Sequence, residues 1–377
     1  MRAEELVARF PFTGAPADGD DWRLLQSEIT EAIRRGDEAF LLELHARSER
    51  HPLLQGWPHQ SAFRALAMIQ SPDVLRRFLE RAKNPPKSEL HTSIQPLADA
   101  PARNLGALLA YAQDDAMLER ELEWFGPEPP LQDLFACWIQ ERAVRGSEVG
   151  RSPFVTAFWE RLPSSHPLAV LPLHTVPLEE KCVRTSTRRY DTLGNWFDFE
   201  GANWSRGGSP GTWTTGAKEL TCDARVMASV LSEEALAPNA MWEGRVFKLD
   251  RAPLRVEALS LFSLGLECLG AAPPPKARAN TAHEVMSLLL QLGTGGGAYV
   301  AARSAAWGRL LAWRSLRALT GAATSSSLEE IGTLAEQCQW AQFESESDWF
   351  NHVVIDVGLV CLRPSGEVAV LAMTDSD

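Results

Sequence analysis

Four arginines on one expected helix are the residues of this chain best suited to binding an anion. The segment Ala298–Leu319 contains no acidic residue, and its bases are Arg303, Arg309, Arg314 and Arg317. Small residues open this segment and apolar residues occur nearly all round it, which predicts a central and mostly buried helix. Because a guanidinium cannot stay unpaired in a dry interior, each of these arginines needs a partner.

Two interpretations of these arginines stay open. In the first, carboxylates from the C-terminal segment 328–377, such as Asp356 or Asp375, pair with some of them inside the fold. In the second, Arg303, Arg314 and Arg317, which share one broad sector of the helix, line a site for an acidic ligand together with the same two aspartates. We expect internal pairing, and we keep the ligand site as the alternative.

A glycine run, Gly293–Gly297, leads directly into the arginine-bearing helix. Helix starts present unpaired N–H groups, and glycine lets a backbone approach an anion closely, so Gly295, Gly296 and Gly297 are candidate ligand contacts. The phosphate-binding P-loop and the GxGxxG dinucleotide motif are both absent. We favour the other interpretation, a tight turn that permits close packing of two helices.

An acidic group precedes the last strands of the chain. Glu344, Glu346 and Asp348 lie close to His352, which is a composition that suits a metal or acid–base chemistry. Neither HExxH nor HxH occurs there, so we predict no metal site and no catalytic residue, and we expect no cofactor. The three carboxylates are instead candidate contacts to a protein partner, with a solvated loop as the alternative.

Tryptophan is unusually frequent, with thirteen copies against three tyrosines. Large aromatic cores are the expected use, although tryptophan also anchors recognition surfaces. The Gly-, Ser- and Thr-rich region 188–216 holds three of them, and it predicts a long ordered loop or a few short strands. We name Trp196, Trp204 and Trp213 as candidate partner contacts.

The charge distribution limits the possible partners. The net charge is −12, and the stretch 324–377 holds ten acids and one base, or −9. This balance disfavours nucleic acid and anionic membranes, and it favours another protein, in particular a basic one. The six cysteines form no CxxC pair, the start lacks a signal-peptide core, and the apolar runs are too short to span a bilayer, so we expect a cytoplasmic protein.

The pattern of elements predicts an α-rich α+β protein in two parts. Residues 1–165 form a helical array, either solenoid-like or an irregular bundle, and residues 166–377 form an α+β domain with the 188–216 loop. Helices are expected over 217–236, 281–292 and 327–340, the last two opened by capping boxes. A strand is expected at 245–250, and a C-terminal hairpin turns at Arg363–Gly366. Because both hairpin strands are apolar on both faces, they should lie inside a covered sheet whose other strands come from 166–250.

Several segments of the second part resemble a bacterial protein family of unknown function found in actinomycetes and myxobacteria. The resemblance covers roughly the segment 198–377, and the parts that carry it are Leu266–Leu269, Gly296–Tyr299, Ala306–Leu316, Asp348–Phe350 and Leu371–Asp377. It implies a bacterial cytoplasmic protein, and it assigns no activity and no site residues.

Three functional hypotheses remain at the sequence level. The leading one is a non-enzymatic protein-binding module, such as a bacterial immunity or defence component that neutralises a basic toxin. The second is an enzyme or small-molecule sensor that binds an anion at Gly293–Gly297 and the following helix. The third is a structural scaffold or self-assembling subunit, and the sequence leaves the oligomeric state open.

Overall fold

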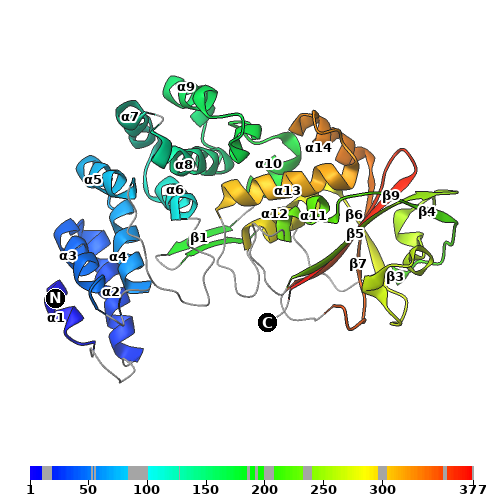
Figure 1. Ribbon diagram of the computed structural model, residues 1–377, viewed down its shortest axis with the longest axis horizontal. Helices are drawn as coiled ribbons and strands as arrows, with labels where there is room; N and C mark the ends of the chain where they lie inside the picture. Colours follow the sequence, from blue (N-terminus) through cyan, green and yellow to red (C-terminus); the bar gives the residue numbers. More distant parts are fainter. Residues whose placement is uncertain are drawn as a thin grey trace. The chain divides into compact units, whose positions relative to one another are not determined.

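The structure is a computed structural model of residues 1–377 (Figure 1). It describes all residues except 11–18, 52–53, 55–56, 84–100, 127, 185–186, 192–193, 199–207, 232–239, 296–303, 351–354 and 376–377. The chain forms two compact units, described separately below. The helical unit comprises Met1–Ala143, Ser147–Leu173 and Tyr190–Gly194, and the sheet unit comprises Val144–Gly146, His174–Arg189 and Asn195–Asp377.

The helical unit is a series of short helices that pack mainly on near neighbours in the sequence. Ser71 caps the fifth helix through its side chain and is followed by Pro72, as the Ser-Pro pattern predicts. Within the described ranges, none of the helices has both the length and the apolar character needed to cross a bilayer. The helices are α1 Ala3–Val7, α2 Gly19–Arg35, α3 Glu38–Ser48, α4 Trp57–Ala67, α5 Pro72–Ala82, α6 Pro101–Ala112, α7 Asp115–Phe125, α8 Gln132–Val144 and α9 Pro153–Arg161, with 3-10 turns η2 Pro129–Leu131, η3 Val149–Arg151 and η4 Pro167–Val170.

The sheet unit contains a seven-stranded antiparallel sheet in the order β3-β6-β7-β8-β9-β5-β4. Its C-terminal hairpin, β8 and β9, lies inside the sheet, and Gly366 adopts a φ of 77° at the turn. The predicted α+β class, with helices followed by a sheet that includes this hairpin, is confirmed. The strands are β3 Ser209–Pro210, β4 Ala217–Leu220, β5 Met241–Leu249, β6 Lys276–Asn280, β7 Gln339–Glu344, β8 Ile355–Leu362 and β9 Glu367–Asp375, and β1 Thr187–Asp191 and β2 Gly194–Asp198 form a separate pair.

Both faces of this sheet are covered, which explains why its central strands are apolar on both sides. Helices α11 Ala224–Met227, α12 Ala282–Gly295 and α13 Ala305–Thr320 contact strands β5, β7 and β9 (Figure 1). On the opposite face, Phe343, Val360 and Val370 form one buried cluster with leucines from the segment 256–269. Side chains alternate between the faces, so successive residues of a central strand contact the two apolar layers in turn.

Helix α13 is the central buried helix that the sequence predicts, although it begins at Ala305 and not at Ala298. Ser304 caps its start, and 13 of its 16 residues are buried. Gly293 of α12 and Gly308 of α13 lie against each other, and a Cβ at Gly293 would lie 2.6 Å from the Gly308 carbonyl oxygen. This contact supports the interpretation of the glycine run as a device for close helix packing. The C-terminal hairpin also caps α13, because Arg363 donates to the carbonyls of Ala318 and Leu319.

Several elements of the sheet unit differ from the predictions or were not predicted. The expected helix over 217–236 begins as strand β4 and continues into the short helix α11, because its first residues pair with β5. The apolar stretch 254–269 forms 3-10 turns, namely η7 Val256–Ala258, η8 Leu261–Leu264 and η9 Glu267–Leu269. Strands β6 and β7 were not predicted, and they lie outside the segment 166–250 from which the other strands of the sheet were expected. The helix opened by the Ser327 capping box, α14 Leu328–Gln337, ends where β7 begins.

A pair of stacked histidines gives the helical unit a predicted pH dependence. The rings of His45 and His59 stack at 3.9 Å, and each Nδ1 lies 3.1 Å from the other residue's carbonyl oxygen. Burial, and then the neighbouring His59 imidazole, lowers the pKa of His45 from 6.5 to about 4. Between these two pH values the unfolded chain binds more protons than the folded chain, so stability is complete above pH 6.5 and falls as the pH drops towards 4.

We expect this histidine to account for about 1–2 kcal/mol of stability loss over that range, since His45 is only half-buried. The measurement is the free energy of urea unfolding of the wild type and of His45→Phe at several pH values. The variant keeps an aromatic ring beside His59 and removes the titrating group. Parallel pH curves for the two proteins would contradict the assignment.

Candidate functional site

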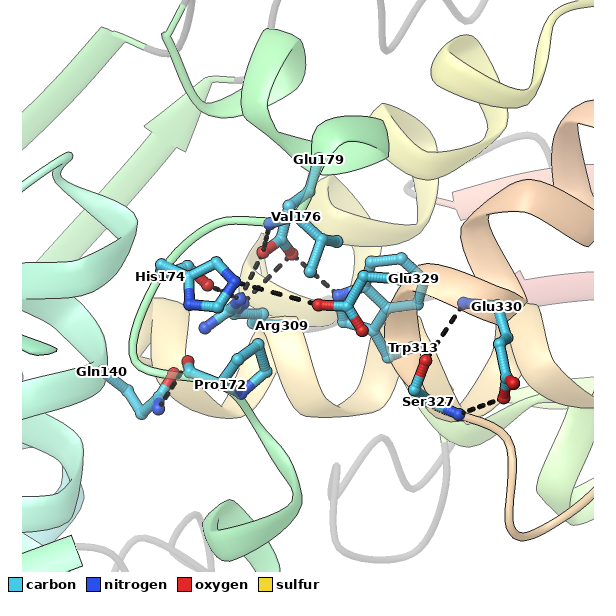
Figure 2. Close-up of polar contacts among 10 residues, drawn as sticks. All are labelled: Gln140, Pro172, His174, Val176, Glu179, Arg309, Trp313, Ser327, Glu329 and Glu330. Atoms are coloured by element: carbon cyan, nitrogen blue, oxygen red, sulfur yellow. Dashed lines mark hydrogen bonds and ion pairs between the residues drawn. The ribbon is translucent and has the colours of Figure 1, made fainter.

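Among the described arginines of the predicted helix, Arg309 is the most deeply buried, with a side chain that is 1% exposed. It forms an ion pair with Glu179 of helix α10 Pro177–Arg184, which is 0% exposed (Figure 2). The Nε of Arg309 donates to one carboxylate oxygen at 3.0 Å, and its Nη2 donates to the other. The same Nη2 also donates to the carbonyl oxygen of His174 at 2.6 Å.

The Glu179 carboxylate accepts hydrogen bonds from three residues, Arg309 and Trp313 of α13 and Val176 just before α10. Besides the two bonds from Arg309, its carboxylate accepts the indole N–H of Trp313 at 2.7 Å and the backbone N–H of Val176 at 3.0 Å (Figure 2). Because each oxygen already accepts two hydrogen bonds, this centre has no free position for a ligand. The arrangement fastens α10 to α13, and we interpret it as structural.

This geometry confirms one prediction about Arg309 and adds a partner that the sequence analysis did not name. The guanidinium lies deep in the fold, as expected for a central helix. The carboxylate that pairs with it in the structure belongs to Glu179. We had expected the partner to come from the C-terminal segment 328–377, and Glu179 lies well before that segment. The physical reason is that α10 packs against α12 and α14, next to α13, so that Glu179 reaches the buried guanidinium.

The other predicted ligand residues do not gather on one side of the sheet. Asp356 lies opposite Thr374 in the ladder and accepts its hydroxyl at 2.9 Å. Asp375 lies opposite Ile355, on the other face, and is 1% exposed. Arg317 donates to the carbonyl oxygen of Ser326 at 3.2 Å. Arg314 is half-buried on α13 and has further contacts of its own.

Several predicted contacts lie outside the described residues or at their edge. Gly295 is the last residue of α12, whereas Gly296, Gly297 and Arg303 lie outside the described residues. The anion site at the glycine run therefore stays a prediction. Trp204 and His352 also lie outside the described residues, and for Trp196 only its place in β2 is described.

Trp213 is a partly buried core residue. It packs against the cluster on the sheet face opposite the helices, and its backbone exchanges hydrogen bonds with Ala258 and Ser260 at 2.8 and 2.7 Å. The guanidinium of Arg251 lies 5.3 Å from its ring centroid. These contacts within the chain explain why the ring lies where it does, and no protein partner is needed for that. Its role as a partner contact therefore stays a prediction.

The acidic corner, which we define as Glu344, Glu346 and Asp348, lies at and just beyond the end of β7. Glu346 and Asp348 are exposed and Glu344 is half-exposed. Within the described part of the chain, no base lies at ion-pairing distance from any of the three carboxylates. They therefore present unneutralised negative charge.

A pocket of about 350 Å³ opens beside the acidic corner. The residues that line it combine an apolar wall with charged groups: Pro273, Pro274, Pro275, Lys276, Glu344, Ser345 and Glu346. The antiparallel pairing of β6 with β7 brings the two sides together, because it places Lys276 opposite Glu344. Sequence analysis named the two glutamates but missed the strand that faces them.

The next positions inward along the same two strands carry polar side chains that the sequence analysis also missed. Arg278 lies opposite Gln342, and Asn280 lies opposite Trp340. Gln342 is 4% exposed, and neither of its amide atoms has a hydrogen-bond partner in the structure. The alternation of apolar and polar residues from Ala341 to Glu344 was the available signal for this strand.

The remaining thiols and metal-binding side chains of the described residues form no metal centre. All six cysteines are free. A hydrogen bond from Cys361 lowers the pKa of the Cys338 thiol, whereas burial raises the pKa of Cys361. Among the residues that the structure describes, no three His, Cys, Asp or Glu side chains are grouped so as to hold a metal ion.

Comparison with known proteins gives one match. The model of a family of unknown function, DUF6183, matches residues 23–377, so the similarity covers the helical unit as well as the sheet unit. Searches of the curated proteins and of the solved structures found no match.

Proposed function

We propose that this chain, which belongs to the family of unknown function DUF6183, is a non-enzymatic binding protein that recognises a basic partner at its acidic corner. The observation that carries the proposal is a set of three carboxylates that, among the described residues, form no ion pair, beside a pocket with a proline wall. Surface carboxylates without a neutralising base attract a partner of opposite charge and steer its approach.

The pocket suits one lysine or arginine side chain of such a partner. The long aliphatic stem of either residue packs on apolar surface while the charged head stays with polar groups. Here Pro273 and Pro274 supply apolar surface, and Glu344 and Glu346 supply two carboxylates against the single ammonium of Lys276. The lining therefore keeps a net negative charge.

The net charge of −12 supports the same class of partner. Acidic proteins that neutralise basic effectors use such a charge difference, and a bacterial immunity or defence component is the form of this function that we favour. Under this proposal the protein acts by binding, and the contact weakens as salt screens the charges.

The test is capture of a partner by the purified chain from a lysate of its source organism at low and high salt. We expect a positively charged protein to be retained at low salt and released at high salt. Reversal of charge by Glu344→Lys with Glu346→Lys should weaken its binding by about 10-fold or more. Glu336→Lys, an exposed position on α14, is the matched control and should bind as the wild type does.

Two results would overturn the proposal. One is capture of a partner whose binding is unchanged by the double charge reversal. The other is that none of the captured proteins is released when the salt concentration is raised.

A further inference from the structure

Two cysteines lie next to each other where helix α14 meets the sheet. Cys338 joins α14 to β7, and Cys361 lies within β8. Cys361 is opposite Trp340 in the β7–β8 ladder, and Cys338 precedes Trp340 by two residues with an extended backbone, φ −77° and ψ 153°. Because opposite residues share a face of the sheet, as do residues two apart in a strand, the two thiols lie on the same face.

The two side chains contact each other through their sulfur atoms. The thiol of Cys361 donates a hydrogen bond to the sulfur of Cys338. A disulfide forms when two such sulfurs approach to about 2.05 Å, which requires side chains that already face each other. Cys338 and Cys361, both free in the structure, meet this requirement.

The surroundings give the two thiols different roles in an oxidation. Cys338 is 8% exposed, whereas Cys361 is 0% exposed, so a small oxidant reaches Cys338 first. The hydrogen bond from Cys361, and to a lesser degree the positive charge of Arg363, lower the pKa of the Cys338 thiol against the opposing effect of burial. Burial raises the pKa of Cys361. Since the thiolate is the reactive form, Cys338 is the thiol that an oxidant attacks.

We propose that Cys338 and Cys361 form a redox-sensitive pair that a peroxide converts into a disulfide. In the first step the sulfur of Cys338 attacks one oxygen of the peroxide, the O–O bond breaks, and the thiol proton leaves with the other oxygen as water. In the second step the sulfur of Cys361 attacks the sulfenic acid of Cys338. The S–O bond breaks, and the hydroxide leaves as water with the proton of Cys361. The two thiols lose two electrons in total, and one hydrogen peroxide is reduced to two waters.

The disulfide would tie the C-terminal end of α14 to a central strand of the sheet. It closes the segment 339–360 into a loop, and a closed loop of this length lowers the entropy of the unfolded chain. The oxidised sheet unit should therefore resist unfolding better than the reduced one. This bond would form whether or not the acidic corner binds a partner.

The test is peroxide treatment of the purified chain, followed by alkylation of the free thiols in denaturant. We expect the chain to lose two of its six free thiols and to regain them with dithiothreitol. Trypsin leaves both cysteines in one peptide, because no lysine or arginine lies between Arg317 and Arg363. A glutamate-specific protease then cuts at Glu344 and Glu346, and mass spectrometry shows whether the two halves stay linked.

Variants separate this pair from the other thiols. Cys338→Ser should prevent the disulfide, and Cys361→Ala should leave Cys338 as a sulfenic acid that dimedone labels. Cys222→Ser is the matched control and should still lose two thiols. Cys222 is less buried than the other cysteines, but burial raises the pKa of its thiol, so we expect it to react after Cys338. The mapping of the wild type needs no variant, and it decides the matter even if Cys361→Ala fails to fold.

The thermal midpoint of the sheet unit tests the effect of the bond. We expect oxidation to raise this midpoint by about 5 °C or more, and dithiothreitol to reverse the rise. Cys338→Ser should show no rise. Three results would overturn the proposal: oxidation of Cys222 while Cys338 and Cys361 stay unlinked, a disulfide between two chains in place of one within the chain, or an oxidised protein whose midpoint equals that of the reduced one.

Discussion

Replacing Glu179 with alanine is expected to lower the free energy of unfolding by about 3–5 kcal/mol. The substitution leaves the Arg309 guanidinium in an interior where it is 1% exposed, with no opposite charge from Glu179. It also removes the acceptor of the Trp313 indole N–H and of the Val176 backbone N–H. Each of these buried donors adds its own cost when it is left unpaired. Urea unfolding, followed by tryptophan fluorescence, measures the change.

Two comparisons show whether the loss comes from the buried charge. Glu329→Gln alters an exposed contact, in which the Glu329 carboxylate lies 3.8 Å from Nε2 of His174, and should change stability by less than about 1 kcal/mol. The double variant Glu179→Leu with Arg309→Met removes both charges and should be more stable than Glu179→Ala alone, because no charge stays buried without its partner. A loss below about 1 kcal/mol for Glu179→Ala would contradict the structural role.

The sequence predicted the elements of the sheet unit where the local signal was strong. The capping boxes at Thr281 and Ser327 both form, with the acidic side chain of each returning to the backbone N–H of its cap. The burial of the α13 helix followed from its apolar residues, and the terminal hairpin followed from its turn residues. In each case the decisive interactions lie within a few residues of one another.

Glu179 was missed as a partner of Arg309 because it is 130 residues away in the sequence. Periodicity shows that an arginine is buried, but it does not show which acid meets it. The concentration of acids after residue 324 suggested a partner in that region, yet the hairpin meets the end of α13 with a base, Arg363, bound to the last carbonyls of the helix. That contact follows from the helix dipole, which favours a cation at the C-terminal end.

The polar side chains of β6 and β7 next to the pocket were missed for a related reason. Its residues belong to β6 and β7, two strands whose positions are separated by the whole of α12, α13 and α14. Strand β6 has only five residues, and alanines alternate in it with Lys276, Arg278 and Asn280, so it lacks the usual β-branched signal. Only the pairing register shows that Arg278 faces Gln342.

Gly358 is the site of the second large expected effect. It lies opposite Phe343 in the β7–β8 ladder, on the face that carries the apolar cluster. A Cβ built at Gly358 would lie 2.4 Å from two atoms of the Phe343 ring and 2.5 Å from a third. Phe343 is 1% exposed and packs against Phe350, so its ring has little room to move. The Phe343 ring therefore leaves no room for a side chain at position 358.

We expect Gly358→Ala to cost about 2 kcal/mol. Overpacking of a closed core costs about 1–3 kcal/mol, and the better strand propensity of alanine returns only about 0.5–1 kcal/mol. Phe343→Leu in the same chain should restore part of the loss, so the double variant should lose less than the sum of the two single changes. Gly332→Ala, on α14, is the matched control, because its nearest neighbour would lie at 3.4 Å, an ordinary contact distance. If Gly358→Ala proves as harmless as Gly332→Ala, the close packing of Phe343 on the β8 backbone is wrong.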